Sequence, residues 1–156
     1  KKTMAYQKLQ VGLGVNVIPS DTINIPNVAG PTESGSATST SANNLVDTAA
    51  TFTDNLVGYI VYNTTDNTVA TVNSITDANT LVLSADIMAS GENYTLYADD
   101  NAGCVLYVGG AGDLRVLTSS GSDITFTGVL AGSFIPVQVK KVFATSNTAS
   151  SILALW

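Results

Sequence analysis

Val69-Ala70-Thr71-Val72-Asn73-Ser74-Ile75 and Thr80-Leu81-Val82-Leu83 are two short apolar runs separated by residues that include Asp77 and Asn79. Both are rich in Val, Ile, Leu and Thr and end at turn-forming residues, which predicts two β-strands. The pattern recurs along the chain and no segment has a helical period, so the sequence predicts an all-β fold. The other predicted strands are residues 8–17, 58–62, 94–97, 105–108, 114–117, 124–127, 135–144 and 151–156.

Strict alternation in the run Pro136-Val137-Gln138-Val139-Lys140-Lys141-Val142-Phe143 gives both faces of that strand a mixed character. Val137, Val139 and Lys141 share one face, and Gln138, Lys140 and Val142 share the other. We therefore expect that this strand need not have one face exposed to solvent.

Two shifts in composition predict how the chain is divided. Residues 30–44 form a Gly/Ser/Thr-rich segment with nothing to bury, which is typical of a linker, and residues 98–103 form a turn-rich return. Between them Asp and Glu occur without any Lys or Arg. We expect a small β-module, residues 33–98, inserted into a discontinuous outer β-domain of residues 1–32 and 99–156. The alternative is one continuous sandwich.

The composition limits the possible partners. Only 12 % of the 156 residues are charged, although 45 % are hydrophobic, so the surface consists largely of hydroxyl and amide groups. Such groups cost less to desolvate than Lys or Glu, which suits a protein packed among neighbours; a secreted β-domain with a neutral surface is the alternative. The net charge of −6 leaves no basic patch for nucleic acid. No apolar run is long enough for a membrane span and no signal peptide is recognised, so we expect synthesis in a cytoplasm.

The residues offer little for catalysis, and we expect no enzyme, cofactor or metal site. The chain has no His and a single Cys, Cys104, which excludes catalytic triads, a Cys–His pair, the common zinc sets and an intrachain disulfide. Acidic residues in predicted turns are expected to form Asx turns rather than a glycosidase pair: Asp47, Asp54, Asp66, Asp77 and Asp86. Asn63 and Asn93 match glycosylation sequons but are interpreted as turn residues.

Gly109-Gly110-Ala111-Gly112-Asp113 has some likeness to a Ca²⁺-binding repeat, but it occurs only once. We expect a tight hairpin turn in which Gly supplies a positive φ.

The aromatic and apolar residues at the end of the sequence are the candidate contact residues. Trp156 follows Ile152-Leu153-Ala154-Leu155, and a large aromatic there frays unless something buries it. Two interpretations stay open: a last strand packed in its own core, or an anchor in a subunit or virion contact formed by Ile152, Leu153, Leu155 and Trp156. Strand spacing places Tyr94 and Tyr97 on opposite faces, which argues against a shared sugar-binding face with Tyr59 and Tyr62.

Several blocks of the sequence resemble, in order, the small virion proteins of tailed phages and gene transfer agents known as capsid spike-base or head-decoration proteins. The blocks are Val17-Ile18-Pro19-Ser20-Asp21-Thr22, Leu106-Tyr107-Val108-Gly109-Gly110-Ala111-Gly112-Asp113-Leu114, Ile124-Thr125-Phe126-Thr127-Gly128-Val129, Ala131-Gly132-Ser133-Phe134-Ile135-Pro136-Val137 and Val139-Lys140-Lys141-Val142-Phe143-Ala144-Thr145 with Ile152-Leu153-Ala154-Leu155-Trp156. Compact members of that family lack the middle segment, which resembles a small barrel-like module that recurs in phage structural proteins.

The resemblance implies an antiparallel β-sandwich-like outer domain with an inserted small β-barrel-like module. It also implies a non-enzymatic decoration (cement) or spike-base subunit on the capsid surface, forming a homo-oligomer, with the major capsid protein, other virion proteins or a fibre or spike protein as partners. The alternative is a tail or fibre-associated module that binds a host glycan or receptor. In the first hypothesis the outer domain, which contains all the basic residues, attaches to the virion and the acidic insert points away from it.

Overall fold

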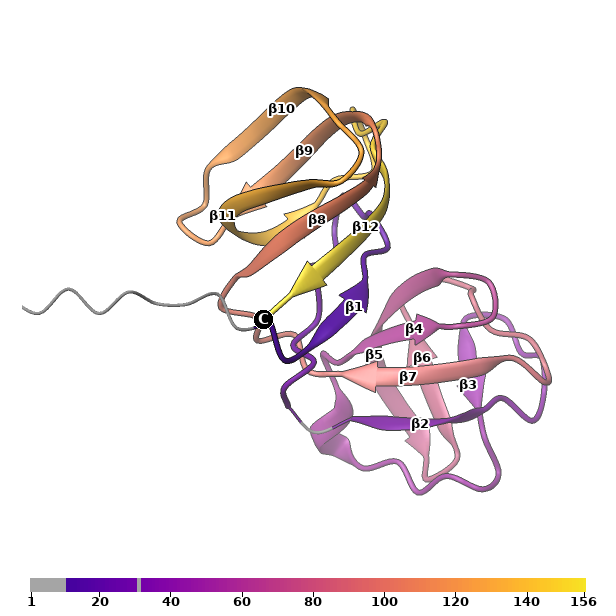
Figure 1. Cartoon of the computed structure of the whole chain (residues 1–156). Helices are drawn as coiled ribbons and strands as arrows, with labels where there is room; N and C mark the ends of the chain where they lie inside the picture. Colours follow the sequence, from indigo (N-terminus) through magenta and orange to yellow (C-terminus); the bar gives the residue numbers. More distant parts are fainter. Residues whose placement is uncertain (1–10, 31) are drawn as a thin grey trace, which may run out of the picture.

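The computed structural model describes residues 11–30 and 32–156, and it contains two six-stranded antiparallel sheets (Figure 1). The first sheet has the strand order β1-β12-β8-β11-β9-β10 and the second has the order β2-β7-β4-β5-β6-β3. Among the described residues the only helical turn is η1 (Asp54–Leu56). The all-β prediction is confirmed, and no described helix is long and apolar enough to cross a membrane.

Strands from both ends of the described chain build the first sheet. They are β1 (Gly14–Asn16), β8 (Cys104–Gly110), β9 (Gly112–Thr118), β10 (Asp123–Val129), β11 (Ser133–Val142) and β12 (Ser150–Leu155). One face covers a core whose fully buried members include Leu106, Val108, Leu114, Val116 and Val139. β11 pairs with β8 over its first half and with β9 over its second, so the sheet folds over its own core.

The second sheet is continuous in sequence. Its strands are β2 (Glu33–Ser36), β3 (Asn44–Val46), β4 (Ile60–Asn63), β5 (Thr68–Asp77), β6 (Thr80–Leu83) and β7 (Asn93–Tyr97). Its core is separate from that of the first sheet and includes Leu45, Leu56, Val61, Leu81 and Leu96, all buried. A bridge between Ser39 and Val46 brings the two edges of the sheet together, which makes this unit barrel-like as expected. Independent folding of residues 33–98 stays a prediction.

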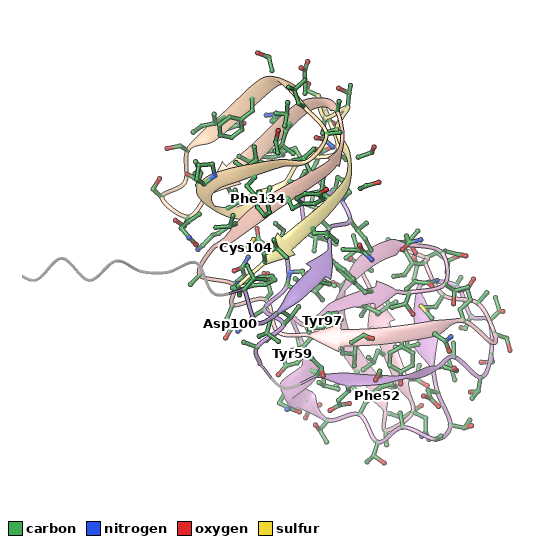
Figure 2. The ribbon with its side chains drawn as sticks, viewed as in Figure 1. Phe52, Tyr59, Tyr97, Asp100, Cys104 and Phe134 are labelled. Atoms are coloured by element: carbon green, nitrogen blue, oxygen red, sulfur yellow. The ribbon has the colours of Figure 1, made fainter. Side chains whose placement is uncertain are left out.

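The two sheets are joined near residues 24–27 and 98–101. The Asn27 amide donates to the Ala98 carbonyl at 3.0 Å, and the Asn27 side chain donates to Asp100 at 2.8 Å. Asn24 donates to Asp99 at 3.1 Å. Figure 2 shows Asp100 and Tyr97 in the region between the two units. The predicted turn-rich return is therefore a hydrogen-bonded junction.

The prediction that residues 30–44 form a linker with nothing to bury is wrong. Residues 33–36 form β2, which pairs with β7 through backbone hydrogen bonds that do not depend on side-chain type. Ala37 is only 2 % exposed, and its amide donates to Glu92 at 2.8 Å. The small side chains therefore let this segment complete the second sheet.

The predicted hairpin at Gly109–Asp113 is also wrong. β8 and β9 are not paired, because β11 lies between them, and none of the three glycines has a positive φ. They are needed for close approach instead: a Cβ on Gly109 would lie 2.9 Å from Ser151, and one on Gly112 would lie 2.5 Å from the backbone of Thr148 and Ala149. The chain therefore passes in close contact with residues 148–151 as it leaves β8 and enters β9.

Most predicted strands change by a few residues at their ends, and the predictions for residues 8–17 and 135–144 change the most. The predicted strand at residues 8–17 is reduced to β1, and its residues 8–10 lie outside the described part of the chain. In β11 the register shifts between Val139 and Lys141, so Val139 and Val142 both reach the core. This bulge overturns the predicted mixed faces, because it re-aims the second half of the strand.

Candidate contact surface

The four candidate contact residues lie on β12, between β1 and β8, or directly after it. Ile152 is 3 % exposed and points into the core of the first sheet, whereas Leu153 and Leu155 alternate to the opposite face and are half-buried. Trp156 packs against the core, and its Nε1 donates to Asn101 Oδ1 at 3.3 Å. The four candidate residues therefore lie on two different faces. Leu153 and Leu155 lie on the outer face, and Ile152 and Trp156 pack in or against the core.

Leu153 belongs to a row of apolar side chains on that outer face. It pairs directly with Tyr107 on β8, which in turn pairs with Phe134 on β11. The Tyr107 and Phe134 rings are 5.3 Å apart with an interplanar angle of 61°. Phe134 is 56 % exposed, and Figure 2 shows it on the upper unit. We call Tyr107, Phe134, Leu153 and Leu155 the outer apolar face.

The outer apolar face is not uniformly exposed. Leu155 pairs with Val105 on β8, which is only 7 % exposed, whereas Leu130, in the turn that leads into β11, is 73 % exposed. A sheet face normally carries polar side chains when it is solvated, and monomers seldom expose contiguous apolar patches. This face therefore has the character of a contact surface.

Sequence reasoning named Leu153 and Leu155 but missed Tyr107 and Phe134. A signal was present, because Cys104-Val105-Leu106-Tyr107-Val108 is apolar at five consecutive positions. In a strand such a run places apolar side chains on both faces, so it indicates that both faces are covered.

Cationic side chains lie elsewhere on the same sheet. Arg115 on β9 alternates with the buried Leu114 and Val116, so it lies on the face turned away from the core. Its guanidinium makes two hydrogen bonds to Asp123, one of them at 2.7 Å, and lies 4.3 Å from the ring centroid of Phe143. The hydrogen bond from Arg115 lowers the pKa of Asp123.

Asp21 fixes the loop that follows β11. Its carboxylate accepts hydrogen bonds from the amides of Ala144 and Thr145 and from the Thr145 hydroxyl, the last at 2.7 Å. The bonds from Thr145 are the main reason why the pKa of Asp21 lies below its ordinary value of 3.8. Asp21 therefore has a local structural role.

Two of the five acidic residues that were expected to form Asx turns do so. Asp47 and Asp77 accept hydrogen bonds from the amides two residues on, as predicted for Asx turns, and Asp86 instead accepts one from the Asn43 amide. A hydrogen bond from Asp66 to Glu92 raises the pKa of Asp66.

Asn63 organises the same region. Its side chain donates to the Ile87 carbonyl and to Glu92, and its Oδ1 accepts from the amides of Thr65 and Asp66. Asn63 is fully buried, so all these bonds stabilise the turn after β4. Its predicted role as a turn residue is confirmed.

Cys104 has no reactive character. It is 1 % exposed, and burial raises the pKa of its thiol to about 12, so it stays protonated at neutral pH. Its Sγ lies 3.2 Å from the Val139 carbonyl. Within residues 11–30 and 32–156, no group of three or more His, Cys, Asp or Glu side chains is placed to hold a metal ion.

Tyr94 and Tyr97 point to opposite sides of β7, as predicted. Tyr94 packs in the core of the second sheet near Phe52, and Tyr97 stacks edge-on against Tyr62 at 5.5 Å. The four tyrosines therefore do not share one face, and Tyr62 and Tyr97 are the two that lie side by side.

No family model, curated protein or solved structure matches this chain.

Proposed function

We propose that this protein is a non-enzymatic structural component of a tailed bacteriophage virion, a capsid decoration or spike-base subunit whose copies associate through the outer apolar face. The observation that carries the proposal is the row of Leu153, Tyr107 and Phe134 on the face of the first sheet opposite its core. An apolar row with no charge at its centre suits a self-complementary contact between copies.

The charge distribution supports attachment to the virion by the same sheet. Arg115, Lys140 and Lys141 all lie on β9 or β11, and residues 33–98 contain no basic residue. Of the two sheets, only the first therefore offers cationic side chains to an acidic partner, with Lys140 and Lys141 in addition to Arg115, which is already paired with Asp123. The low content of charged residues suits a protein surrounded by others.

The test compares variants that change the outer face with one that changes an exposed apolar residue elsewhere. Leu153→Lys and Phe134→Lys place a charge on the outer apolar face, and Val57→Lys is the matched control because Val57 is 49 % exposed beside the second sheet. Each protein is examined by light scattering for its oligomeric state, by circular dichroism for folding, and by cosedimentation with empty capsids of the parent phage.

We expect the native protein and Val57→Lys to be oligomeric and to sediment with capsids. Leu153→Lys and Phe134→Lys should be folded monomers that stay in solution. A native protein that is monomeric and binds host cells rather than capsids would overturn the proposal in favour of a receptor-binding module.

A further inference from the structure

The second sheet closes on itself at one end only. The Thr38 amide donates to the Val46 carbonyl at 2.7 Å, which joins the extension of β2 to β3. At the other end, residues 33–36 and residues 47–51 separate and line a cleft of about 540 Å³. β2 lies at the edge of the sheet (Figure 1), with β7 as its ladder partner on one side and this cleft on the other.

The hydrogen bonds of β7 fix which way the backbone of β2 faces. Asn93 accepts a hydrogen bond from the Thr64 amide at 2.9 Å, so the backbone groups of Asn93 face β4. Successive residues of a strand turn their backbone groups to opposite neighbours, so those of Tyr94 face β2. Gly35 is the partner of Tyr94 and therefore directs its own backbone groups to β7.

Ser34 and Ser36 consequently direct their N–H and C=O groups into the cleft. Thr38 continues this alternation, and its N–H is the one that bonds to Val46 at the closed end. Ser34 and Ser36 thus present the next two positions of the same ladder, and an edge of this kind pairs readily with another strand.

The cleft has the size of a short strand. A strand residue occupies about 160 Å³, from a rise of about 3.3 Å, a strand spacing of about 4.8 Å and a sheet thickness of about 10 Å. The cleft therefore holds about three residues, which is the length needed to pair with both Ser34 and Ser36.

The floor of the cleft carries a buried carboxylate. Asp47 is 4 % exposed and accepts hydrogen bonds from the Ala49 amide and the Tyr94 hydroxyl, and it forms no salt bridge with a described residue. A carboxylate has about four acceptor positions, so it can accept further bonds. The middle residue of an added strand would lie beside Gly35, which has no side chain, and would point inward to Asp47.

We propose that this cleft binds an extended peptide segment as an additional strand against β2, with a basic side chain directed at Asp47. The recognition is by main-chain hydrogen bonds to Ser34 and Ser36 and by charge at the central residue. The proposal goes beyond capsid attachment, since it uses the second sheet alone and stands or falls independently of the outer apolar face.

The probe is a fluorescent acetyl-Thr-Val-Lys-Val-Thr-amide peptide, whose binding to the full chain is measured by fluorescence anisotropy. The β-branched residues favour an extended backbone, and the central Lys is placed opposite Gly35. We expect saturable binding that weakens at least tenfold when both Val nitrogens are methylated, because these N–H groups would face β2. Methylation of the Lys and second Thr nitrogens, which would face away, is the matched control and should have little effect.

Two substitutions in the protein test the location. Ser34→Pro removes the N–H that faces the cleft while sparing the pairing with β7, and Ser34→Ala is its control. Ala49→Phe fills the cleft. Both Ser34→Pro and Ala49→Phe should weaken peptide binding about tenfold or more, with unchanged circular dichroism.

Several outcomes would overturn the proposal. They are absence of binding at millimolar peptide, equal binding of the Val-methylated peptide, and unchanged binding to the folded Ser34→Pro and Ala49→Phe proteins. Binding of maltotriose without binding of the peptide would assign the cleft to saccharides instead. Loss of capsid attachment in Leu153→Lys would not alter peptide binding, which separates the two proposals.

Discussion

The Tyr94 hydroxyl donates a hydrogen bond to Asp47 Oδ2 at 2.8 Å, directly beneath Gly35. A Cβ on residue 35 would lie 2.5 Å from that oxygen and 2.7 Å from the Tyr94 hydroxyl. Burial and the bond to Asp47 both raise the pKa of Tyr94, so its hydroxyl stays a donor across the physiological range. Gly35 therefore lets β2 lie against this buried pair.

Gly35→Ala should lower the free energy of unfolding by about 1–3 kcal/mol, because the methyl group must displace Asp47 or Tyr94. Urea denaturation followed by circular dichroism measures the change. Gly30→Ala is the control, since a Cβ there meets its nearest atoms at 3.7 Å and beyond. Equal stability of the two variants would show that the pair moves aside at no cost.

Gly112→Ala should also destabilise the protein, here by about 1–3 kcal/mol, because its Cβ would meet backbone atoms of Thr148 and Ala149 that cannot rotate away. Gly12→Ala, with nothing within 4 Å of its Cβ, is the comparison and should be neutral or slightly stabilising. Thermal unfolding of both variants checks this. A native-like melting temperature for Gly112→Ala would contradict the close approach of residues 148–151.

The stabilising effect of Asp21 should depend on pH. Its pKa is lowered in the folded protein, so its contribution is present above the ordinary value of 3.8 and is lost as the pH falls through the lower, folded pKa. We expect Asp21→Ala to melt below the native protein at pH 7 and the difference to shrink below pH 4. Thr145→Val, which removes one donor to Asp21, should show a smaller difference of the same kind. A difference that is constant with pH would refute the carboxylate's role.

Much of the strand content was predictable from local pattern. The strand predicted at residues 80–83 is β6 with the same ends, because it alternates buried and half-buried residues between clear turn signals. The errors have non-local causes. β2 consists of Glu, Ser and Gly, whose β-propensities do not predict a strand. It is stabilised by pairing with β7, some sixty residues away.

A non-local contact also explains the error at Gly109–Gly112. The glycines there indicate a turn, but the local sequence does not show which segment packs against them. The partner segment, residues 148–151, becomes visible only in the folded chain. The apolar contact candidates at residues 152–156 could be identified from the sequence. Which of them face the core and which face outward depends on the register of β12 against β8. A shift by one residue would have exchanged the two faces.

Replacement of residues 33–98 by a short Gly-Ser loop should leave the first sheet folded. Asn27 donates to Asp100 and Asn24 donates to Asp99, and these bonds between the flanking segments do not involve the insert, so a short loop can connect them. Circular dichroism and the oligomeric state of the shortened protein are the measurements, and it should still cosediment with capsids. If residues 1–32 and 99–156 fail to fold without the insert, the continuous sandwich is the better description.

β12 lies between β1 and β8, so the last of the described strands joins the first of them to the rest of the sheet. During synthesis the second sheet, whose strands follow one another closely, can form as soon as residues 33–97 have emerged. β1 stays unpaired until its partner β12 has been translated. The outer apolar face, which needs Leu153 and Leu155 beside Tyr107, therefore cannot form on the nascent chain before β12 has been translated.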